Sequence, residues 1–146
     1  MRKCILSLAL CYLMLFAGSV QAFAAETNVF AASTAHFSIT PYMDYIAQAN
    51  GTLYINSKGV ATVDCDVYGY QGTTTRVDIS ANLQQYKSGR WVTIKTFTAE
   101  SNSHRTSLSN TYTVTKGYTY RVQATIKAYS GSSVETRTVT SSEANY

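Results

Sequence analysis

The segment from Gly117 to Tyr129 constrains the fold more than any other part of the sequence. Apolar and aromatic side chains occupy every second position from Tyr118 to Ala128, and mostly polar side chains fill the positions between them. Successive side chains of a β-strand point to opposite faces, so this alternation predicts a strand with one buried and one solvated face. It is the longest clean run of its kind in the chain.

Shorter alternating runs on both sides of this segment extend the interpretation to most of the chain. Turn residues, mostly including glycine, separate them at spacings of about 8–12 residues, and no helical period appears. We therefore expect an all-β, antiparallel sandwich or barrel. Its seven strands are predicted at Gly51–Ile55, Val60–Tyr68, Arg76–Tyr86, Trp91–Phe97, Thr106–Val114, Gly117–Tyr129 and Val134–Thr140.

The N-terminus has the features of a secretory signal peptide. Arg2 and Lys3 form a positively charged start, and Cys4–Phe16 is an apolar run of 13 residues. A membrane-spanning helix needs about 20 apolar residues, so this run is too short for one. Small residues allow cleavage after either Ala22 or Ala25, and the sequence does not decide between them.

These features divide the chain into three parts. Residues 1–25 are expected to form the signal peptide, and residues 26–50 a flexible leader. A weak strand at Phe37–Ile46 lies within the leader, and Pro41 would confine it to a sheet edge. Residues 51–146 are expected to form the β-sandwich domain.

Removal of the signal peptide leaves a mildly basic chain with one cysteine. The sequence has 12 Lys+Arg against 8 Asp+Glu, and the loss of Arg2 and Lys3 lowers the net charge from +4 to +2. The basic residues form no cluster, so no nucleic-acid partner is expected. No second apolar run approaches spanning length, so the mature form is not expected to span a membrane. Cys65 has no partner for an intramolecular disulfide and lies on the apolar side of its strand, which predicts a buried thiol.

The start of the Gly117–Tyr129 segment resembles strand F of fibronectin type III domains. There the pattern Tyr-x-hydrophobic-x-Val-x-Ala is usual, and Tyr118 to Ala124 match it. The first tyrosine of such strands forms a tyrosine corner by hydrogen bonding to backbone just upstream, a role that the resemblance gives to Tyr118. In immunoglobulin domains a bridging cysteine stands two positions later, where this chain has Tyr120. Because Cys65 occupies the position of the other bridging cysteine, the resemblance implies that Cys65 and Tyr120 face each other across the core.

Four short segments recur in a known family: Leu83-Gln84, Gly89-Arg90-Trp91, Gly117–Arg121 and Glu135–Thr138. Through them the chain from about Gly51 to Tyr146 resembles a family of small secreted proteins of unknown function from Gram-positive bacteria. The resemblance implies an immunoglobulin-like (fibronectin type III-like) sandwich of about seven strands and a location outside the cell, but no activity.

No recognisable catalytic motif occurs in the sequence. There is no G-x-S-x-G or H-E-x-x-H, and neither His36 nor His104 has a nucleophile or carboxylate at a known motif spacing. A Cys65–His104 pair would need an accessible thiol, which the apolar surroundings of Cys65 argue against. Asp64 and Asp66 share a strand face, but no Asx-rich loop supplies the further oxygens that calcium needs. We expect no catalytic residue, no metal and no cofactor.

A recognition surface is predicted on the outward sides of two strands. In fibronectin-type order the Arg76–Tyr86 and Tyr118–Tyr129 strands are neighbours, so their polar positions form one face. Tyrosine, arginine and amide side chains are common in recognition surfaces; an ordinary solvated sheet face is the alternative. The expected ligand-binding residues are Gln84, Tyr86, Arg121, Gln123 and Tyr129.

The only tryptophan, Trp91, is expected in the core beside Val92 and Ile94, with a sugar-stacking platform as the alternative.

The sequence as a whole leads to the hypothesis of a secreted, non-enzymatic module that binds a protein or a glycan at the cell exterior. It would bind through this face or through the loops at one end of the sandwich. Two alternatives remain: a small secreted hydrolase around His104 and the carboxylates, and a purely structural extracellular protein.

Overall fold

The computed structural model describes residues 33–35 and 43–146, which contain strands and turns but no helix. Accordingly, this part of the chain has no helix that could cross a membrane. The predicted signal peptide, Pro41 and most of the leader lie outside the described residues. The strands are β1 (Ser33–Ala35), β2 (Ile46–Ile55), β3 (Val60–Gly69), β4 (Arg76–Lys87), β5 (Arg90–Ser101), β6 (Arg105–Thr113), β7 (Thr119–Ser130), β8 (Ser133–Thr140) and β9 (Ala144–Asn145).

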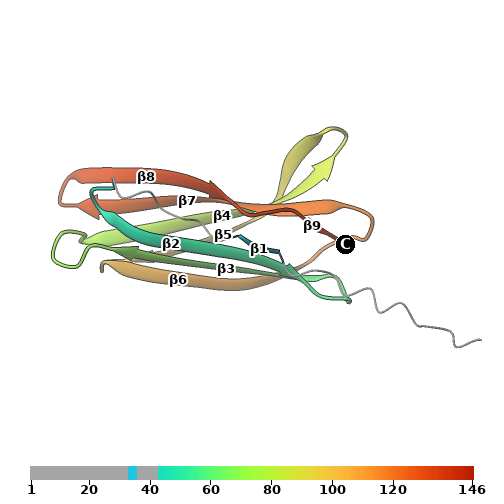
Figure 1. The fold of residues 1–146 in the computed structure, drawn as a ribbon, viewed down its shortest axis with the longest axis horizontal. Helices are drawn as coiled ribbons and strands as arrows, with labels where there is room; N and C mark the ends of the chain where they lie inside the picture. The colour runs from blue at the N-terminus through green and yellow to red at the C-terminus, as the bar shows by residue number, and fades with distance from the viewer. Residues whose placement is uncertain (1–32, 36–42) are drawn as a thin grey trace, which may run out of the picture.

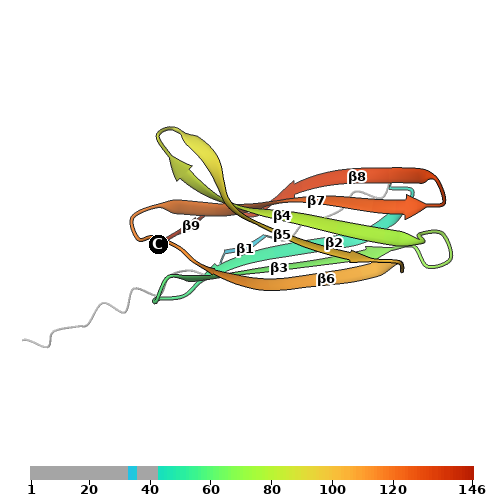
Figure 2. The same ribbon diagram turned by 180° about the vertical axis from the view of Figure 1, so that it is seen from behind.

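Two antiparallel sheets pack face to face, as the two views in Figures 1 and 2 show. One sheet has the order β1-β2-β3-β6, and the other has the order β5-β4-β7-β8, with β9 paired to the start of β7. The seven long strands, β2 to β8, correspond to the seven expected ones, and the predicted antiparallel sandwich is confirmed. The predicted pairing of β4 with β7 is also confirmed, over the register Arg76↔Tyr129 to Gln85↔Tyr120.

The core lies between the sheets and is built from the alternating apolar positions. Ten side chains there are at most 2 % exposed. They are Tyr120, Ile46, Leu53, Ile79, Leu83, Ile126, Val63, Val67, Val77 and Cys65. Fully burying a large aliphatic side chain contributes about 1.5–3 kcal/mol to stability. The predicted burial of Cys65 is confirmed at 2 % exposure. The polar side chains occupy the alternate positions of each strand, and therefore point away from the core.

The first long strand begins earlier than expected. β2 starts at Ile46 rather than at residue 51, and Ile46 is completely buried. One carboxylate oxygen of Glu135, on β8 of the opposite sheet, accepts hydrogen bonds from the N–H groups of Tyr45 (2.9 Å) and Ile46 (3.0 Å). The Tyr45 carbonyl in turn accepts a 2.6 Å hydrogen bond from the Thr74 hydroxyl. Part of the predicted leader therefore belongs to the sandwich.

The tyrosine corner is formed by Tyr120 and not by Tyr118. The Tyr120 hydroxyl donates a 2.5 Å hydrogen bond to the Thr115 carbonyl and accepts one of 3.0 Å from the Gln85 amide. Its ring is completely buried, whereas Tyr118 is only partly buried against the core. Burial raises the pKa of the Tyr120 hydroxyl, and its hydrogen bonds with Gln85 and Thr115 oppose this rise. The resemblance therefore predicted a tyrosine corner correctly but assigned it to the wrong tyrosine.

Cys65 and Tyr120 lie at different levels of the core, so the expected contact between them is wrong. Cys65 lies near the loop that joins β3 to β4, because β3 ends at Gly69. Tyr120 is paired with Gln85, near the other end of β4. Cys65 precedes the last residue of β3 by about four positions, whereas Gln85 follows the first residue of β4 by about nine. Cys65 and Tyr120 therefore differ in level by about five residues along the strands, or roughly 16 Å at about 3.3 Å per residue.

The hairpin that joins β4 to β5 extends beyond the sandwich, at the top of Figure 1. Its two-residue loop has positive φ at both Ser88 (53°) and Gly89 (78°), the conformation that suits the twist of a tight hairpin. The register shifts between Leu83 and Gln84, where Ile94 of β5 has no paired residue. Such a bulge bends the strands and increases their twist, which accounts for the departure of the hairpin from the sheet.

Candidate functional site

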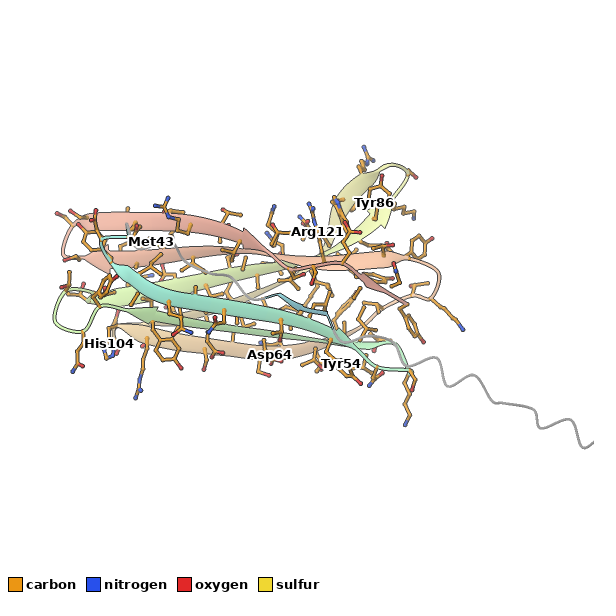
Figure 3. The ribbon with its side chains drawn as sticks, viewed as in Figure 1. Met43, Tyr54, Asp64, Tyr86, His104 and Arg121 are labelled. Carbon is orange, nitrogen blue, oxygen red and sulfur yellow. The ribbon has the colours of Figure 1, made fainter. Side chains whose placement is uncertain are left out.

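The candidate site lies on the outer face of the sheet formed by β5, β4, β7 and β8. Gln84 and Arg121 are directly paired across β4 and β7, and Tyr86 is directly paired with Trp91 across the hairpin. Their side chains share the outer face, where Figure 3 places Tyr86 and Arg121 near each other at the base of the projecting hairpin. We call these four residues the Trp91 cluster.

The Trp91 cluster holds Arg121 from two directions. The Arg121 Nε–H donates a 2.8 Å hydrogen bond to the Gln84 side-chain oxygen, and Gln84 is only 8 % exposed. The guanidinium carbon lies 4.2 Å from the centre of the Trp91 ring, a cation–π contact worth about 0.5–2 kcal/mol. The Tyr86 and Trp91 rings are 5.2 Å apart at 57° to each other. The cluster is therefore held in place by contacts between its own members.

Trp91 is not in the core, so the expectation that it fills the sandwich interior is wrong. Phe97, on the same strand, is buried, and a regular alternation would point Trp91 in the same direction. The unpaired Ile94 lies between them, and one extra residue moves the following side chains to the opposite face. Trp91 consequently joins the outer face beside Tyr86.

A shallow concavity adjoins the Trp91 cluster. Its volume is about 470 Å³, and Tyr86, Trp91, Thr119 and Glu143 line it. The Thr119 hydroxyl donates a 2.8 Å hydrogen bond to the side chain of Asn145 on β9, which fixes this edge. The concavity thus combines two aromatic rings with a hydroxyl and a carboxylate, a set that can pack against an apolar surface and exchange hydrogen bonds with polar groups.

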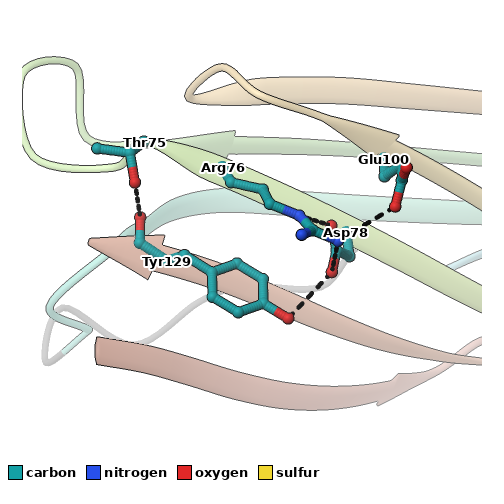
Figure 4. A network of polar contacts seen from close by, with 5 residues as sticks. All are labelled: Thr75, Arg76, Asp78, Glu100 and Tyr129. Carbon is teal, nitrogen blue, oxygen red and sulfur yellow. Dashed lines mark hydrogen bonds and ion pairs between the residues drawn. The ribbon is translucent and has the colours of Figure 1, made fainter. Parts of the chain in front are cut away.

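Tyr129, although predicted as part of the same site, belongs to a separate network (Figure 4). Its hydroxyl donates a 3.0 Å hydrogen bond to Asp78, and its ring lies 5.1 Å from the guanidinium carbon of Arg76. Arg76 donates two hydrogen bonds to Asp78, at 2.8 and 3.0 Å, and one of 3.1 Å to Glu100. The hydrogen bond to Asp78 raises the pKa of Tyr129. We call Arg76, Asp78, Glu100 and Tyr129 the Asp78 network.

The five predicted ligand-binding residues therefore do not form one site: three lie together, one lies far away, and one lies between them. Gln84, Tyr86 and Arg121 meet at Trp91. Tyr129 lies eight residues farther along β7, about 26 Å away at about 3.3 Å per residue. Gln123 lies between the groups, paired with Asn82, whose side chain accepts a 2.7 Å hydrogen bond from Thr96.

The sequence predicted neither Thr119 nor Glu143 as a contributor to the site, and it favoured the core for Trp91, with a sugar-stacking platform as the alternative. Trp91 was the most accessible to prediction, because it stands opposite Tyr86 across a two-residue hairpin loop. Glu143 follows the last predicted strand, in a segment without alternation, so no sequence signal indicated its position.

The residues considered for catalysis do not meet. Burial, followed by the nearby charges of Asp66 and Asp64, raises the pKa of the Cys65 thiol from 9.0 to about 12. Figure 3 shows His104 at the far end of the molecule from Tyr86 and Arg121. Within the described part of the chain, no hydrogen bond or ion pair joins its imidazole to a carboxylate. Asp64 accepts a 2.6 Å hydrogen bond from Ser109, and residues 33–35 and 43–146 contain no metal-binding group of three or more His, Cys, Asp or Glu.

The chain matches no protein-family model, no curated protein and no solved structure.

Proposed function

We propose that the mature protein is a secreted, non-enzymatic recognition module, which binds a protein or a glycan at the cell exterior through the Trp91 cluster. The observation that carries this proposal is the assembly of Tyr86, Trp91 and Arg121 beside a concavity at the base of the projecting hairpin. Tryptophan, tyrosine and arginine are the residue types most enriched among those that dominate binding energy. The hairpin that extends beyond the sandwich carries Tyr86 and Trp91, and Arg121 of β7 lies at its base, where a partner can reach all three.

The internal contacts of the cluster support this proposal. Ordering a long side chain on binding costs about 0.5–1.5 kcal/mol. Gln84 and Trp91 already fix Arg121 on two sides, so much of that cost is met during folding. Arg121 bonds to Gln84 through Nε, and within residues 43–146 its two terminal nitrogens have no hydrogen-bond acceptor, so both can donate to a ligand.

Binding assays with single variants test the proposal. Immobilised wild-type protein would be incubated with insoluble cell-wall material and, separately, with the proteins of the culture medium. Trp91→Ala and Arg121→Ala should each reduce capture about tenfold or more, because losses of about 1.4 kcal/mol or more are typical of such central residues. Melting temperatures should be measured for every variant.

Tyr54→Ala is the matched control, because Tyr54 is as exposed as Tyr86, each at 45 %, but lies on the other sheet (Figure 3). It should leave capture unchanged. Undiminished capture by both Trp91→Ala and Arg121→Ala would contradict the proposal and direct attention to the end loops, at residues 70–75 and 102–104.

We also propose that the sandwich is of the immunoglobulin-like class and that the protein belongs to the family of small secreted proteins from Gram-positive bacteria. The strand order β2-β3-β6 and β5-β4-β7-β8 supports the first part, as does a tyrosine corner at the start of β7. The signal-peptide features of residues 1–25 support secretion. Intact mass of protein from the medium should begin after Ala22 or Ala25, and a full-length, cell-bound species would contradict secretion.

A further inference from the structure

We propose that the ligand is a neutral, linear polysaccharide, whose chain lies along β4 and β7 from the Trp91 cluster to the Asp78 network. This inference rests on the proposed function and specifies its ligand class. It follows from four features of the outer face: two concavities, the lining between them, the charge balance and the placement of the aromatic rings.

The two concavities lie at opposite ends of the same face. One adjoins the Trp91 cluster, with a volume of about 470 Å³. The other has a volume of about 520 Å³ and is lined by side chains of β4, β5 and β7 that include Asp78, Thr98 and Lys127. β7 runs continuously between the two, from Thr119 in the lining of the first to Lys127 in the lining of the second, which is about 26 Å at about 3.3 Å per residue. A compact ligand could fill one concavity, whereas an extended chain could contact both.

Hydroxyl and amide groups cover the face between the concavities and continue into the second one, whose lining includes Ser80, Thr98 and Thr125. Antiparallel pairing aligns them in rows that cross four strands. One row contains Thr96, Asn82, Gln123 and Thr140, and the next contains Thr98, Ser80, Thr125 and Thr138. Hydroxyl and amide groups both donate and accept hydrogen bonds, so repeating rows of them suit a ligand that presents hydroxyl groups at regular intervals.

The charges on this face cancel. Among the described residues of this face, three cationic side chains (Arg76, Arg121 and Lys127) are matched by three anionic ones (Asp78, Glu100 and Glu143). Arg76 is already bonded to both Asp78 and Glu100. A polyanionic ligand would need a surface of one sign to attract it, so the balance favours an uncharged chain.

Aromatic rings stand at both ends of the polar rows. Tyr86 and Trp91 border the first concavity with their rings tilted at 57°, and Tyr129 lies at the other end beside Arg76. An aromatic ring offers a large apolar surface that can pack against the C–H face of a sugar, while the hydroxyls around the sugar ring bond to the polar rows. Peptides lack a repeating hydroxyl pattern and would leave much of this face unused.

An array of immobilised linear oligosaccharides, from disaccharides to octasaccharides, tests the inference with the mature protein. It would include neutral glucans, mannans, xylans and chitin fragments, with sulfated and uronic-acid chains as the charged set. We expect neutral chains to bind, with affinity that rises with length until the chain spans both concavities. Affinity should change little between low and high salt, because no net charge is neutralised.

Two substitutions locate the chain. Trp91→Ala should weaken binding about tenfold or more. Thr98→Val, which removes one exposed hydroxyl near the other end, should weaken the longest oligosaccharides about two- to tenfold, the equivalent of one hydrogen bond. It should leave the shortest ones unaffected. Thr111→Val is the matched control, since Thr111 is exposed on the outer face of the other sheet, paired with Thr62.

The outcomes separate this inference from the proposed function. Binding of charged chains only, or of no glycan, while a secreted protein is captured through Trp91, would overturn the glycan inference and leave the recognition module standing. Glycan binding that Trp91→Ala and Thr98→Val both leave unchanged would overturn the assignment of this face. No capture of any wall material or secreted protein would overturn both.

Discussion

Replacing Tyr120 by phenylalanine removes the tyrosine corner with little change of volume. The substitution deletes the hydrogen bond donated to the Thr115 carbonyl and the one accepted from the Gln85 amide. A neutral hydrogen bond contributes about 0.5–1.5 kcal/mol net, so the two together would contribute about 1–3 kcal/mol. Thr115 is exposed and Gln85 partly so, and water can satisfy both after the change. We therefore expect a loss of about 1–2 kcal/mol in the free energy of unfolding.

Urea and thermal denaturation of the mature protein measure this loss. For domains of 60–100 residues, 1 kcal/mol lowers the melting temperature by about 4–8 °C, so Tyr120→Phe should lower it by roughly 5–15 °C. Tyr118→Phe is the matched control. Its hydroxyl makes no hydrogen bond within residues 43–146, and its loss should cost less than about 0.5 kcal/mol. A Tyr118→Phe variant less stable than Tyr120→Phe would refute the assignment of the corner and the register of β7.

Three further substitutions test other parts of the fold. Glu135→Ala should destabilise the protein by about 2–3 kcal/mol in urea melts, because the two N–H groups at the start of β2 lose a charged acceptor; Glu135→Gln should cost less, and equal costs would contradict the role of the charge. Cys65 should resist maleimide in the native state. Because its pKa is raised in the fold from 9.0 to about 12, the unfolded state loses this proton first as pH rises. Stability should fall by about 1.4 kcal/mol per pH unit in that range, and Cys65→Ala should flatten this slope; an unchanged slope would refute the burial of the thiol. Gly69→Ala should cost about 1–3 kcal/mol, since its Cβ would lie 2.5 Å from the Thr74 hydroxyl oxygen; wild-type stability would contradict this packing.

Alternation predicted the strands, their faces and the burial of Cys65, because one buried face imposes a period of two on every strand of a sandwich. The same period could not identify the tyrosine corner. Tyr118 and Tyr120 are two residues apart and point to the same side, and only the position of the sandwich's end decides which one is enclosed.

The candidate site was predictable where pairing is regular and not where it is interrupted. Gln84 and Arg121 were placed together because β4 and β7 are neighbours. Trp91 was misplaced because the bulge at Ile94 changes the face on which it lies, and nothing in the local sequence signals that bulge. The contact of Glu135 with Tyr45 spans 90 residues and depends on how the two sheets are stacked.

The central claim is that ligand binds at the Trp91 cluster, and the emission of Trp91 tests it most directly. The chain has one tryptophan, so its intrinsic tryptophan fluorescence comes from this cluster alone. Titration of the mature protein with the wall polysaccharide or secreted protein that it captures should change the intensity or wavelength of this emission in a saturable way. The midpoint should agree with the dissociation constant from calorimetry. Saturable binding by calorimetry with no change in Trp91 emission would contradict the claim and place the ligand elsewhere on the molecule.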